Sequence, residues 1–258
     1  MSAILIDGKV VHYETLGRGR PVVFLHGWLG SWRYWMGAMD ELSTHYRTYA
    51  FDFWGFGDSD KVADRYTIPH LVLQLESFLD ALGIWRCDLV GHALGGLVAM
   101  GFSLEFPARV GQMMTVSLPF TGDAIAPGLT RLNPSSVLER VFRRRPLEYP
   151  ALQAEAERAD PLAIAKSLEP LRELDLRRQR PSVRWLAVHG HKDDIVRPPG
   201  VADLEQEGPY FRLILFDRVW HFPMLEEAAK FNRLLKDFLG GDALASLQIK
   251  EEWRRRTR

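Results

Sequence analysis

Six short runs of apolar residues recur along the 258 residues of the chain. The first, VVFL at Val22–Leu25, has no alternation with polar residues, and a run this short without alternation is typical of a strand buried on both faces. The six runs are Val22–Leu25, Thr48–Phe53, Cys87–Val90, Met113–Val116, Val183–Val188 and Phe211–Phe216. Because helical patterns separate them, they predict an α/β fold with a doubly wound, mostly parallel sheet.

Helical patterns of apolar residues lie between the runs, and in the last of them the period is close to 3.6 residues. The patterns are Trp32–Leu42, Ile68–Leu82, Leu94–Phe106, Val201–Glu207 and Met224–Leu239. Ahead of the first buried run, Ala3–Ile6 and Val10–Glu14 flank Asp7-Gly8, a dipeptide that favours a hairpin turn. We therefore expect an antiparallel hairpin before the parallel strands.

The alternation stops between Pro119 and Pro181, a stretch that has no strand signal. Its leucines and helix-forming residues argue against disorder. Three short helices are predicted within it, at Ser135–Arg144, Pro150–Arg158 and Pro161–Leu174. The predicted organisation is a core of residues 1–118 and 182–240, a helical insertion of residues 119–181, and a C-terminal basic tail of residues 241–258.

The composition disfavours several classes of function. Lys and Arg together number 33, as do Asp and Glu, so no net charge draws the chain to nucleic acid or to an acidic membrane. No apolar run approaches the roughly 18 residues that span a bilayer, and the initial MSAILIDGKVVHYE does not resemble a secretory signal. The single cysteine, Cys87, cannot form an intrachain disulfide. We therefore expect a cytoplasmic protein, monomeric or homodimeric, whose partner is a small molecule.

One segment joins the end of an apolar strand to the start of a helix through a turn flanked by glycines. It reads LVGHALGG from Leu89 to Gly96, with Ala93 midway between Gly91 and Gly95. A turn this tight leaves no room for side chains two positions before and after its central residue. The segment resembles the nucleophile elbow of the α/β-hydrolase fold, G-x-S-x-G, whose central residue is a serine, cysteine or aspartate. Here the central residue is alanine.

Four further motifs follow the order seen in that family. His26-Gly27-Trp28 comes directly after the first buried strand, and the segment DFWGFGDS at Asp52–Ser59 resembles D-x-x-G-x-G-x-S. The segment HGHKDD resembles G-x-x-D and puts Asp193 at the position of the acid. The segment WHFPMLE resembles G-H-x-P-x-x-E and puts His221 at the position of the base. The resemblance extends over about residues 3–239.

This resemblance implies a Ser-His-Asp-type triad with Ala93 at the nucleophile position. It assigns the two backbone N–H donors of the oxyanion hole to Trp28 and Leu94. The insertion lies where the family has a helical cap. The implied activity is hydrolysis of a small to medium, partly apolar carboxylic ester or related acyl compound, with no cofactor and no metal. Aromatic residues on the motif loops are expected to line the substrate pocket: Trp54, Trp220 and Phe222.

Several residues near these motifs have other interpretations. Asp194 competes with its neighbour for the acid position, but the G-x-x-D spacing favours the neighbour. Cys87 is interpreted as a small buried hydrophobe rather than a relocated nucleophile. No metal site is expected at His92, His189 and His191, which lack ligand spacing. No lysine or second glycine pattern follows the turn, so the segment does not predict nucleotide binding.

A methyl group cannot attack a carbonyl, and losing the nucleophile of such a triad costs on the order of 10⁶-fold in turnover. Two origins of Ala93 are compatible with the sequence. A serine-to-alanine change made in an enzyme explains why Asp193 and His221 are intact. A natural alanine explains Trp220, where the family usually has glycine. In that case a His–Asp dyad could activate water or abstract a substrate proton, or the pocket could bind a ligand without turnover.

Overall fold

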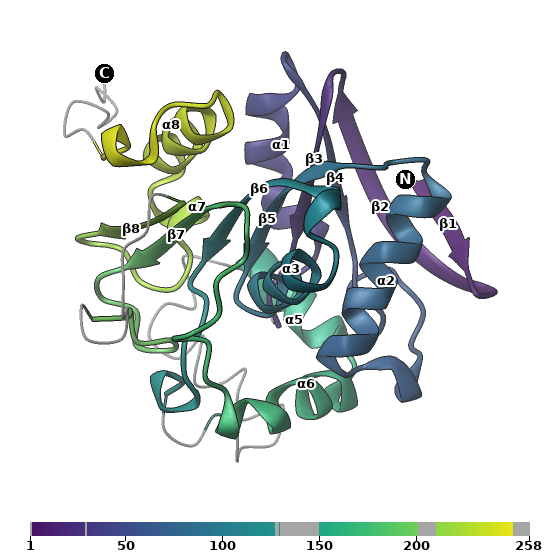
Figure 1. Cartoon of the computed structure of the whole chain (residues 1–258). Coiled ribbons are helices and arrows are strands. Elements are labelled where there is room, and N and C mark those ends of the chain that lie inside the picture. Colours follow the sequence, from purple (N-terminus) through teal and green to yellow (C-terminus); the bar gives the residue numbers. More distant parts are fainter. Residues whose placement is uncertain (1, 29, 127–128, 130–149, 201–209, 250–258) are drawn as a thin grey trace.

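An eight-stranded sheet forms the centre of the molecule (Figure 1). The structure is a computed structural model and describes residues 2–28, 30–126, 129, 150–200 and 210–249. The strands are β1 (Ser2–Ile6), β2 (Lys9–Gly17), β3 (Arg20–Leu25), β4 (Tyr46–Phe51), β5 (Cys87–His92), β6 (Val110–Val116), β7 (Arg184–Gly190) and β8 (Phe211–Phe216). Their order across the sheet is β1-β2-β4-β3-β5-β6-β7-β8. β1 and β2 form the predicted hairpin, β2 pairs antiparallel with β4, and the remaining pairs are parallel.

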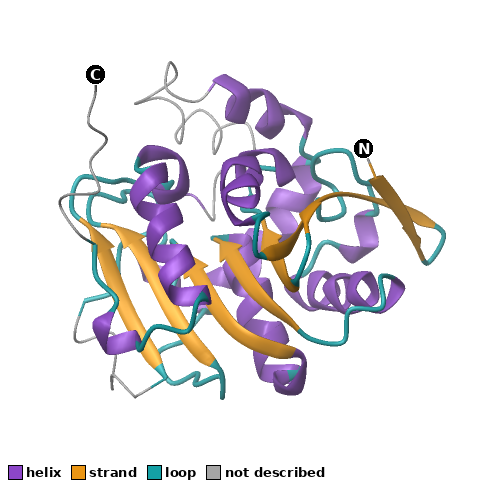
Figure 2. Cartoon of the chain, turned by 90° about the horizontal axis from the view of Figure 1, so that it is seen from above, coloured by secondary structure: helices purple, strands orange, loops and turns teal. Residues whose placement is uncertain are grey.

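Helices lie on both faces of this sheet (Figure 2). They are α1 (Met36–Leu42), α2 (Ile68–Ala81), α3 (Leu94–Glu105), α5 (Pro150–Arg158), α6 (Pro161–Leu168), α7 (Pro223–Glu226) and α8 (Ala228–Leu239). α1 packs beside α8, and α2 packs beside α3. α8 buries Phe231, Leu234 and Phe238, the side chains whose spacing predicted it. The α/β class and the doubly wound, mostly parallel sheet are therefore confirmed.

Two predicted helices are shorter than their apolar patterns. The pattern Pro161–Leu174 forms α6 only as far as Leu168 and continues as a 3₁₀ turn over Glu169–Glu173. Pro170 explains the change, because proline has no N–H and its ring clashes with the preceding helical turn. The pattern Met224–Leu239 divides into α7 and α8 at Glu227, whose φ of −132° and ψ of 52° are not helical.

Other boundaries differ by a few residues. The strand expected at Thr48–Phe53 is β4 and ends at Phe51, because the Phe53 N–H donates to His26 Nε2 at 3.0 Å instead of to a strand. The helix expected at Trp32–Leu42 begins as a 3₁₀ turn over Trp32–Trp35. The predicted helices Ser135–Arg144 and Val201–Glu207, and the basic end of the tail at 250–258, lie outside the described residues.

The two ends of the insertion meet. The Gly122 N–H donates to Leu174 O at 2.9 Å, and the Leu176 N–H donates to Phe120 O at 2.7 Å. The predicted helix Pro150–Arg158 is present as α5. The basic segment Arg177–Arg180 is exposed. Within the part of the chain that the structure describes, no helix has both the length and the apolar character needed to cross a membrane.

α3 approaches β3 so closely that glycine is required at the contact. A Cβ added to Gly95 would lie 2.3 Å from Leu25 O and 2.7 Å from Leu25 Cβ. This contact is between a helix and a central strand, so neither partner can move without disturbing the sheet. Gly37 offers a matched comparison, because it is also helical but has nothing within 4 Å of its added Cβ.

We expect Gly95→Ala to lower the free energy of unfolding by about 2–4 kcal/mol, because the methyl group must push α3 away from β3. Gly37→Ala should leave it within about 1 kcal/mol or raise it, since alanine favours an exposed helix. Urea unfolding followed by circular dichroism measures both values. Equal stability of the two variants would contradict the close approach of α3 and β3.

Candidate active site

Ala93 occupies a strained turn between β5 and α3. Its φ of 48° and ψ of −105° lie where residues with a side chain are rarely found. The Ala93 N–H donates to Val116 O at 2.9 Å, which ties the turn to β6. A Cβ on Gly91 would lie 2.3 Å from Gly95 O, so the flanking glycines are needed here. The turn at the proposed nucleophile position is therefore strained, and such strain commonly marks a functional site.

The loop after β3 lies against this turn. A Cβ added to Gly27 would be 3.3 Å from Ala93 Cβ and 2.7 Å from His92 Nδ1. The next residue, Trp28, is buried, and its indole Nε1–H donates to Ser167 Oγ at 2.8 Å. Leu94 is the first residue of α3, so its N–H belongs to the groups that a helix leaves without an intrahelical acceptor. The segments that carry both expected oxyanion donors thus meet at the turn.

Asp193 and His221 form a buried pair. Asp193 Oδ2 lies 2.8 Å from His221 Nδ1, and Asp193 Oδ1 accepts the N–H groups of Ile195 and Val196 at 2.9 Å each. Burial opposes the charged carboxylate, but the charge and hydrogen bond of His221, together with these two N–H groups, hold the pKa of Asp193 below its usual range. Of the two adjacent aspartates, the spacing favoured Asp193, and Asp193 is hydrogen-bonded to His221; its role as the acid of a triad stays a prediction.

Sequence reasoning missed the residue that holds the His221 loop. The carboxylate of Glu226 accepts the Trp220 N–H at 2.9 Å and the Phe222 N–H at 3.0 Å, so it brackets His221 on both sides. Across from it, a Cβ on Gly190 would lie only 1.9 Å from Trp220 O. Glu226 is the final residue of the motif G-H-x-P-x-x-E, but the motif alone does not indicate which groups its carboxylate binds.

The expected aromatic pocket is only partly brought together by the described contacts. The ring of Phe222 lies 5.1 Å from that of His221, centroid to centroid. Trp54 is buried, its backbone N–H donates to Gln74 Oε1, and the Arg65 guanidinium lies 5.2 Å from its ring. For Trp54 and Trp220 a place in the substrate pocket stays a prediction.

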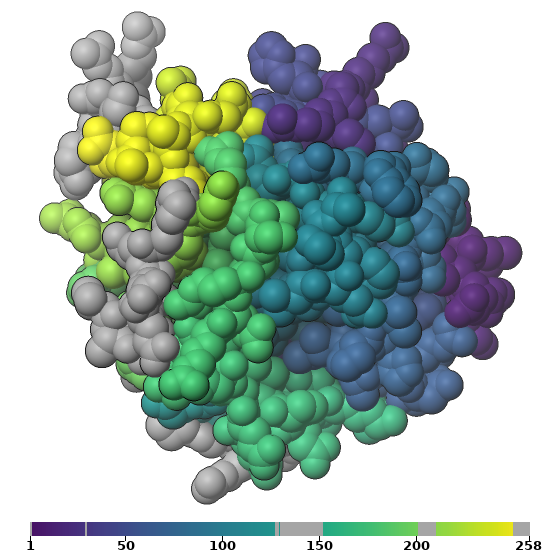
Figure 3. Space-filling model, in the orientation of Figure 1, coloured from purple at the N-terminus to yellow at the C-terminus, as the bar shows by residue number. Residues whose placement is uncertain are grey.

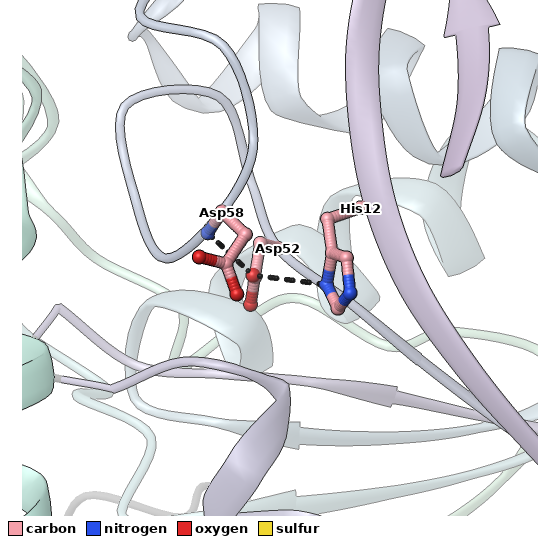
Figure 4. A group of neighbouring side chains, drawn as sticks. All are labelled: His12, Asp52 and Asp58. Atoms are coloured by element: carbon pink, nitrogen blue, oxygen red, sulfur yellow. Dashed lines mark hydrogen bonds and ion pairs between the residues drawn. The ribbon is translucent and has the colours of Figure 1, made fainter. Parts of the chain in front are cut away.

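The segment Asp52–Ser59 is a loop anchored by its first residue. Asp52 Oδ1 accepts the Trp32 N–H at 2.8 Å, and Asp52 Oδ2 accepts the Asp58 N–H at 2.9 Å. Figure 4 shows this second bond and the neighbouring ring of His12, whose Nδ1 is 3.5 Å from Asp52 Oδ2. His12, Asp52 and Asp58 could in principle surround a cation. However, the Asp58 carboxylate is already bound by two arginines and both Asp52 oxygens accept N–H groups, so we assign the cluster to loop structure.

Comparisons with known proteins identify the family of the fold. Residues 20–177 match the family described as the alpha/beta hydrolase fold. The chain is 30% identical to a pimeloyl-[acyl-carrier protein] methyl ester esterase of Aeromonas salmonicida, over 89% of this chain and 99% of that protein. It is 28% identical to a 2-hydroxy-6-oxo-2,4-heptadienoate hydrolase of Pseudomonas putida, over 93% and 96%.

A solved structure with the same fold is a serine-to-alanine mutant of a meta-cleavage product hydrolase from Pseudomonas fluorescens, complexed with acetates. Its TM-score is 0.79 at 22% identity, and the match covers 93% of this chain and 97% of that one. At this identity the similarity concerns the fold.

Besides His221, the histidines at positions 26, 92 and 189 are buried. Burial lowers the pKa of His26 and lowers that of His92 well below its ordinary value. Burial also lowers the pKa of His189 to about 4. Both ring nitrogens of His189 are buried without a hydrogen-bond partner, so a proton there has no compensating acceptor. The folded protein therefore resists protonation of these rings.

We expect the free energy of unfolding to fall as the pH falls from 7 to 5. In the unfolded chain His189 binds a proton near pH 6.5, but in the folded chain only near 4, so the unfolded state gains protons first. In His189→Phe, the free energy of unfolding should fall by about 2 kcal/mol less between pH 7 and pH 5 than in the unmodified chain. Denaturant unfolding at several pH values measures the slope, with the exposed His45→Phe as control. A slope unchanged in His189→Phe would contradict the lowered pKa.

Proposed function

Because the chain belongs to the α/β-hydrolase fold family, we propose that the site around Ala93 is that of an esterase-type hydrolase whose nucleophile position is occupied by alanine. His221 is the proposed base, Asp193 orients it, and the N–H groups of Trp28 and Leu94 are the proposed oxyanion donors. The proposed substrate is a small to medium, partly apolar carboxylic ester or related acyl compound. The names of the two curated relatives, a methyl ester esterase and a heptadienoate hydrolase, support this class.

The 2.8 Å contact between Asp193 Oδ2 and His221 Nδ1 carries the proposal. A carboxylate at Nδ1 fixes the histidine tautomer, so that the other ring nitrogen, Nε2, presents its lone pair as a proton acceptor. It also stabilises the imidazolium that forms after proton transfer. A buried pair of this kind beside a strained turn is the arrangement that acyl transfer requires.

Alanine at position 93 prevents one step of the proposed reaction but not the others. Without a hydroxyl no acyl-enzyme can form, while two N–H donors would still polarise a bound carbonyl. The Asp193–His221 pair supports a second candidate function, because it needs no serine to accept a proton from water or from a carbon acid. Binding of an acyl ligand without turnover is the outcome in which neither reaction occurs.

We further propose that residues 119–181 form a cap over the site. The hydrogen bond from Trp28 Nε1 to Ser167 Oγ supports this, because it joins α6 to the residue that carries a proposed oxyanion donor. A second bond joins the start of α6 to the core, because the N–H of its N-cap residue Asp160 donates to Gly55 O at 2.6 Å. In Figure 3 the green residues of α6 lie directly against the blue core.

A closed ring of charges supports the same docking. Arg33 contacts Asp58 at 2.8 Å and Glu155 at 3.0 Å, and Arg158 contacts the same two carboxylates. Arg33 and Asp58 belong to the core, whereas Glu155 and Arg158 lie on α5. Each of these four side chains contacts two side chains of opposite charge. The entropy lost when one side chain is ordered is therefore offset by two contacts.

We expect Ala93→Ser to hydrolyse p-nitrophenyl acetate about 10³-fold or more faster than the unmodified chain. The physical reason is that the hydroxyl is the only part of the proposed triad that the chain lacks. Release of p-nitrophenolate, followed by absorbance, measures the rate. A short acyl group is chosen so that Trp220 does not crowd the ester.

Two double variants serve as controls for this result. Ala93→Ser combined with His221→Ala should fall back to the rate of the unmodified chain, whereas combination with the exposed His45→Ala should not. A folded Ala93→Ser protein without any gain would contradict the serine-type site. If His221→Ala alone lowers a slow rate of the unmodified chain, the water-activating dyad is favoured.

A further inference from the structure

A chain of four hydrogen-bonding groups joins the loop after β3 to the loop that carries His221. The Gly27 N–H donates to Tyr34 Oη at 2.5 Å, and Tyr34 Oη lies 3.2 Å from His92 Nδ1. On the other side of its ring, His92 Nε2 lies 3.0 Å from the backbone carbonyl oxygen of His221. We call Gly27, Tyr34, His92 and the His221 carbonyl the loop relay.

The chemistry of the end groups fixes the direction of every bond in the loop relay. A carbonyl oxygen only accepts, so His92 Nε2 must carry the proton, and Nδ1 is then an acceptor. The Tyr34 hydroxyl therefore donates to Nδ1 while it accepts from Gly27, whose N–H only donates. Reversing any one bond would leave a buried donor or acceptor without a partner, which costs about 1–3 kcal/mol.

The loop relay stays uncharged over a wide range of pH. Burial raises the pKa of the Tyr34 hydroxyl well above its ordinary value, because it disfavours the phenolate. Burial lowers the pKa of His92 well below its ordinary value, and the nearby His221 adds to this effect. Protonated His92 would also lose Nδ1 as acceptor for Tyr34. The bonds are therefore fixed structural links rather than a proton path.

The two ends of the loop relay are next to the two proposed working parts of the site. Gly27 directly precedes Trp28, a proposed oxyanion donor, and His221 is the proposed base. The His221 carbonyl has a second donor, Ser117 Oγ at 3.1 Å, so its position is set from two directions. The rings of His92 and His221 lie 4.8 Å apart, which leaves little room for independent movement.

We propose that Tyr34 and His92 are positioning residues that hold the proposed base at a set distance from the proposed oxyanion donors. This rests on the function proposed above, because the distance matters only if both parts act on one substrate. Neither side chain needs to touch the substrate. A small displacement between a base and an oxyanion hole is enough to slow an acyl transfer by orders of magnitude.

Kinetics in the Ala93→Ser background test the proposal. Adding Tyr34→Phe or His92→Leu should lower kcat about tenfold or more, with KM changed less than about twofold. His92→Gln can still donate to the His221 carbonyl and should retain more activity than His92→Leu. Tyr34→Phe and His92→Leu together should cost little more than His92→Leu alone, because both cut the same chain. Ser103→Ala removes another buried hydroxyl, on α3 outside the loop relay, and should leave kcat unchanged.

Nuclear magnetic resonance of ¹⁵N-histidine in the unmodified chain gives a reading that does not depend on activity. His92 should show the tautomer protonated at Nε2, and Tyr34→Phe should shift its Nδ1 signal towards that of an unbonded nitrogen. Both Tyr34→Phe and His92→Gln should also shift the ring signals of His221.

The two readings separate the failure of this proposal from failure of the proposed function. An active Ala93→Ser whose kcat is unaffected by Tyr34→Phe and His92→Leu would overturn the loop relay alone. If Ala93→Ser is inactive, the proposed function fails, and the NMR spectra then test the loop relay by themselves. His221 signals unchanged in both folded variants would then overturn the loop relay as well.

Discussion

The rest of the site depends on the tightness of the backbone turn between β5 and α3. Gly91 and Gly95 allow carbonyl oxygens to pass where any Cβ would collide, and Ala93 takes a positive φ of 48° between them. This turn begins α3 at Leu94, directly after the residue that the loop behind β3 approaches. A looser turn would move the helix N-terminus, and with it one proposed oxyanion donor, away from Trp28.

Around this turn, the loops are held mainly through their backbones. The Glu226 carboxylate binds the N–H groups on either side of His221, while His92 and Ser117 bind the His221 carbonyl. Among the described hydrogen bonds, the one to Asp193 is the only one that the His221 side chain makes. This separation explains how the arrangement can persist around an alanine, because none of these contacts involves the residue at the nucleophile position.

Residues could be predicted from the sequence where one local pattern decides the structure. The unbroken apolar runs predicted the parallel strands, and the G-x-x-D spacing selected Asp193. Prediction failed where a distant contact or a backbone break decides. Phe53 leaves β4 because a histidine from another loop binds its N–H. Tyr34 has no motif around it, and its partners His92 and Gly27 come from separate segments, so only the folded chain identifies it.

We propose that the site lacks a nucleophile and no other part of the triad. The most direct measurement is the intact mass of Ala93→Ser after incubation with a p-nitrophenyl alkylphosphonate, which reacts with an activated serine and then stays attached. We expect one adduct per chain, mapped to residue 93, and no adduct in the unmodified chain or when His221→Ala is added. A folded Ala93→Ser protein that remains unmodified would contradict the account, because it would mean that the base or the oxyanion donors are not in place.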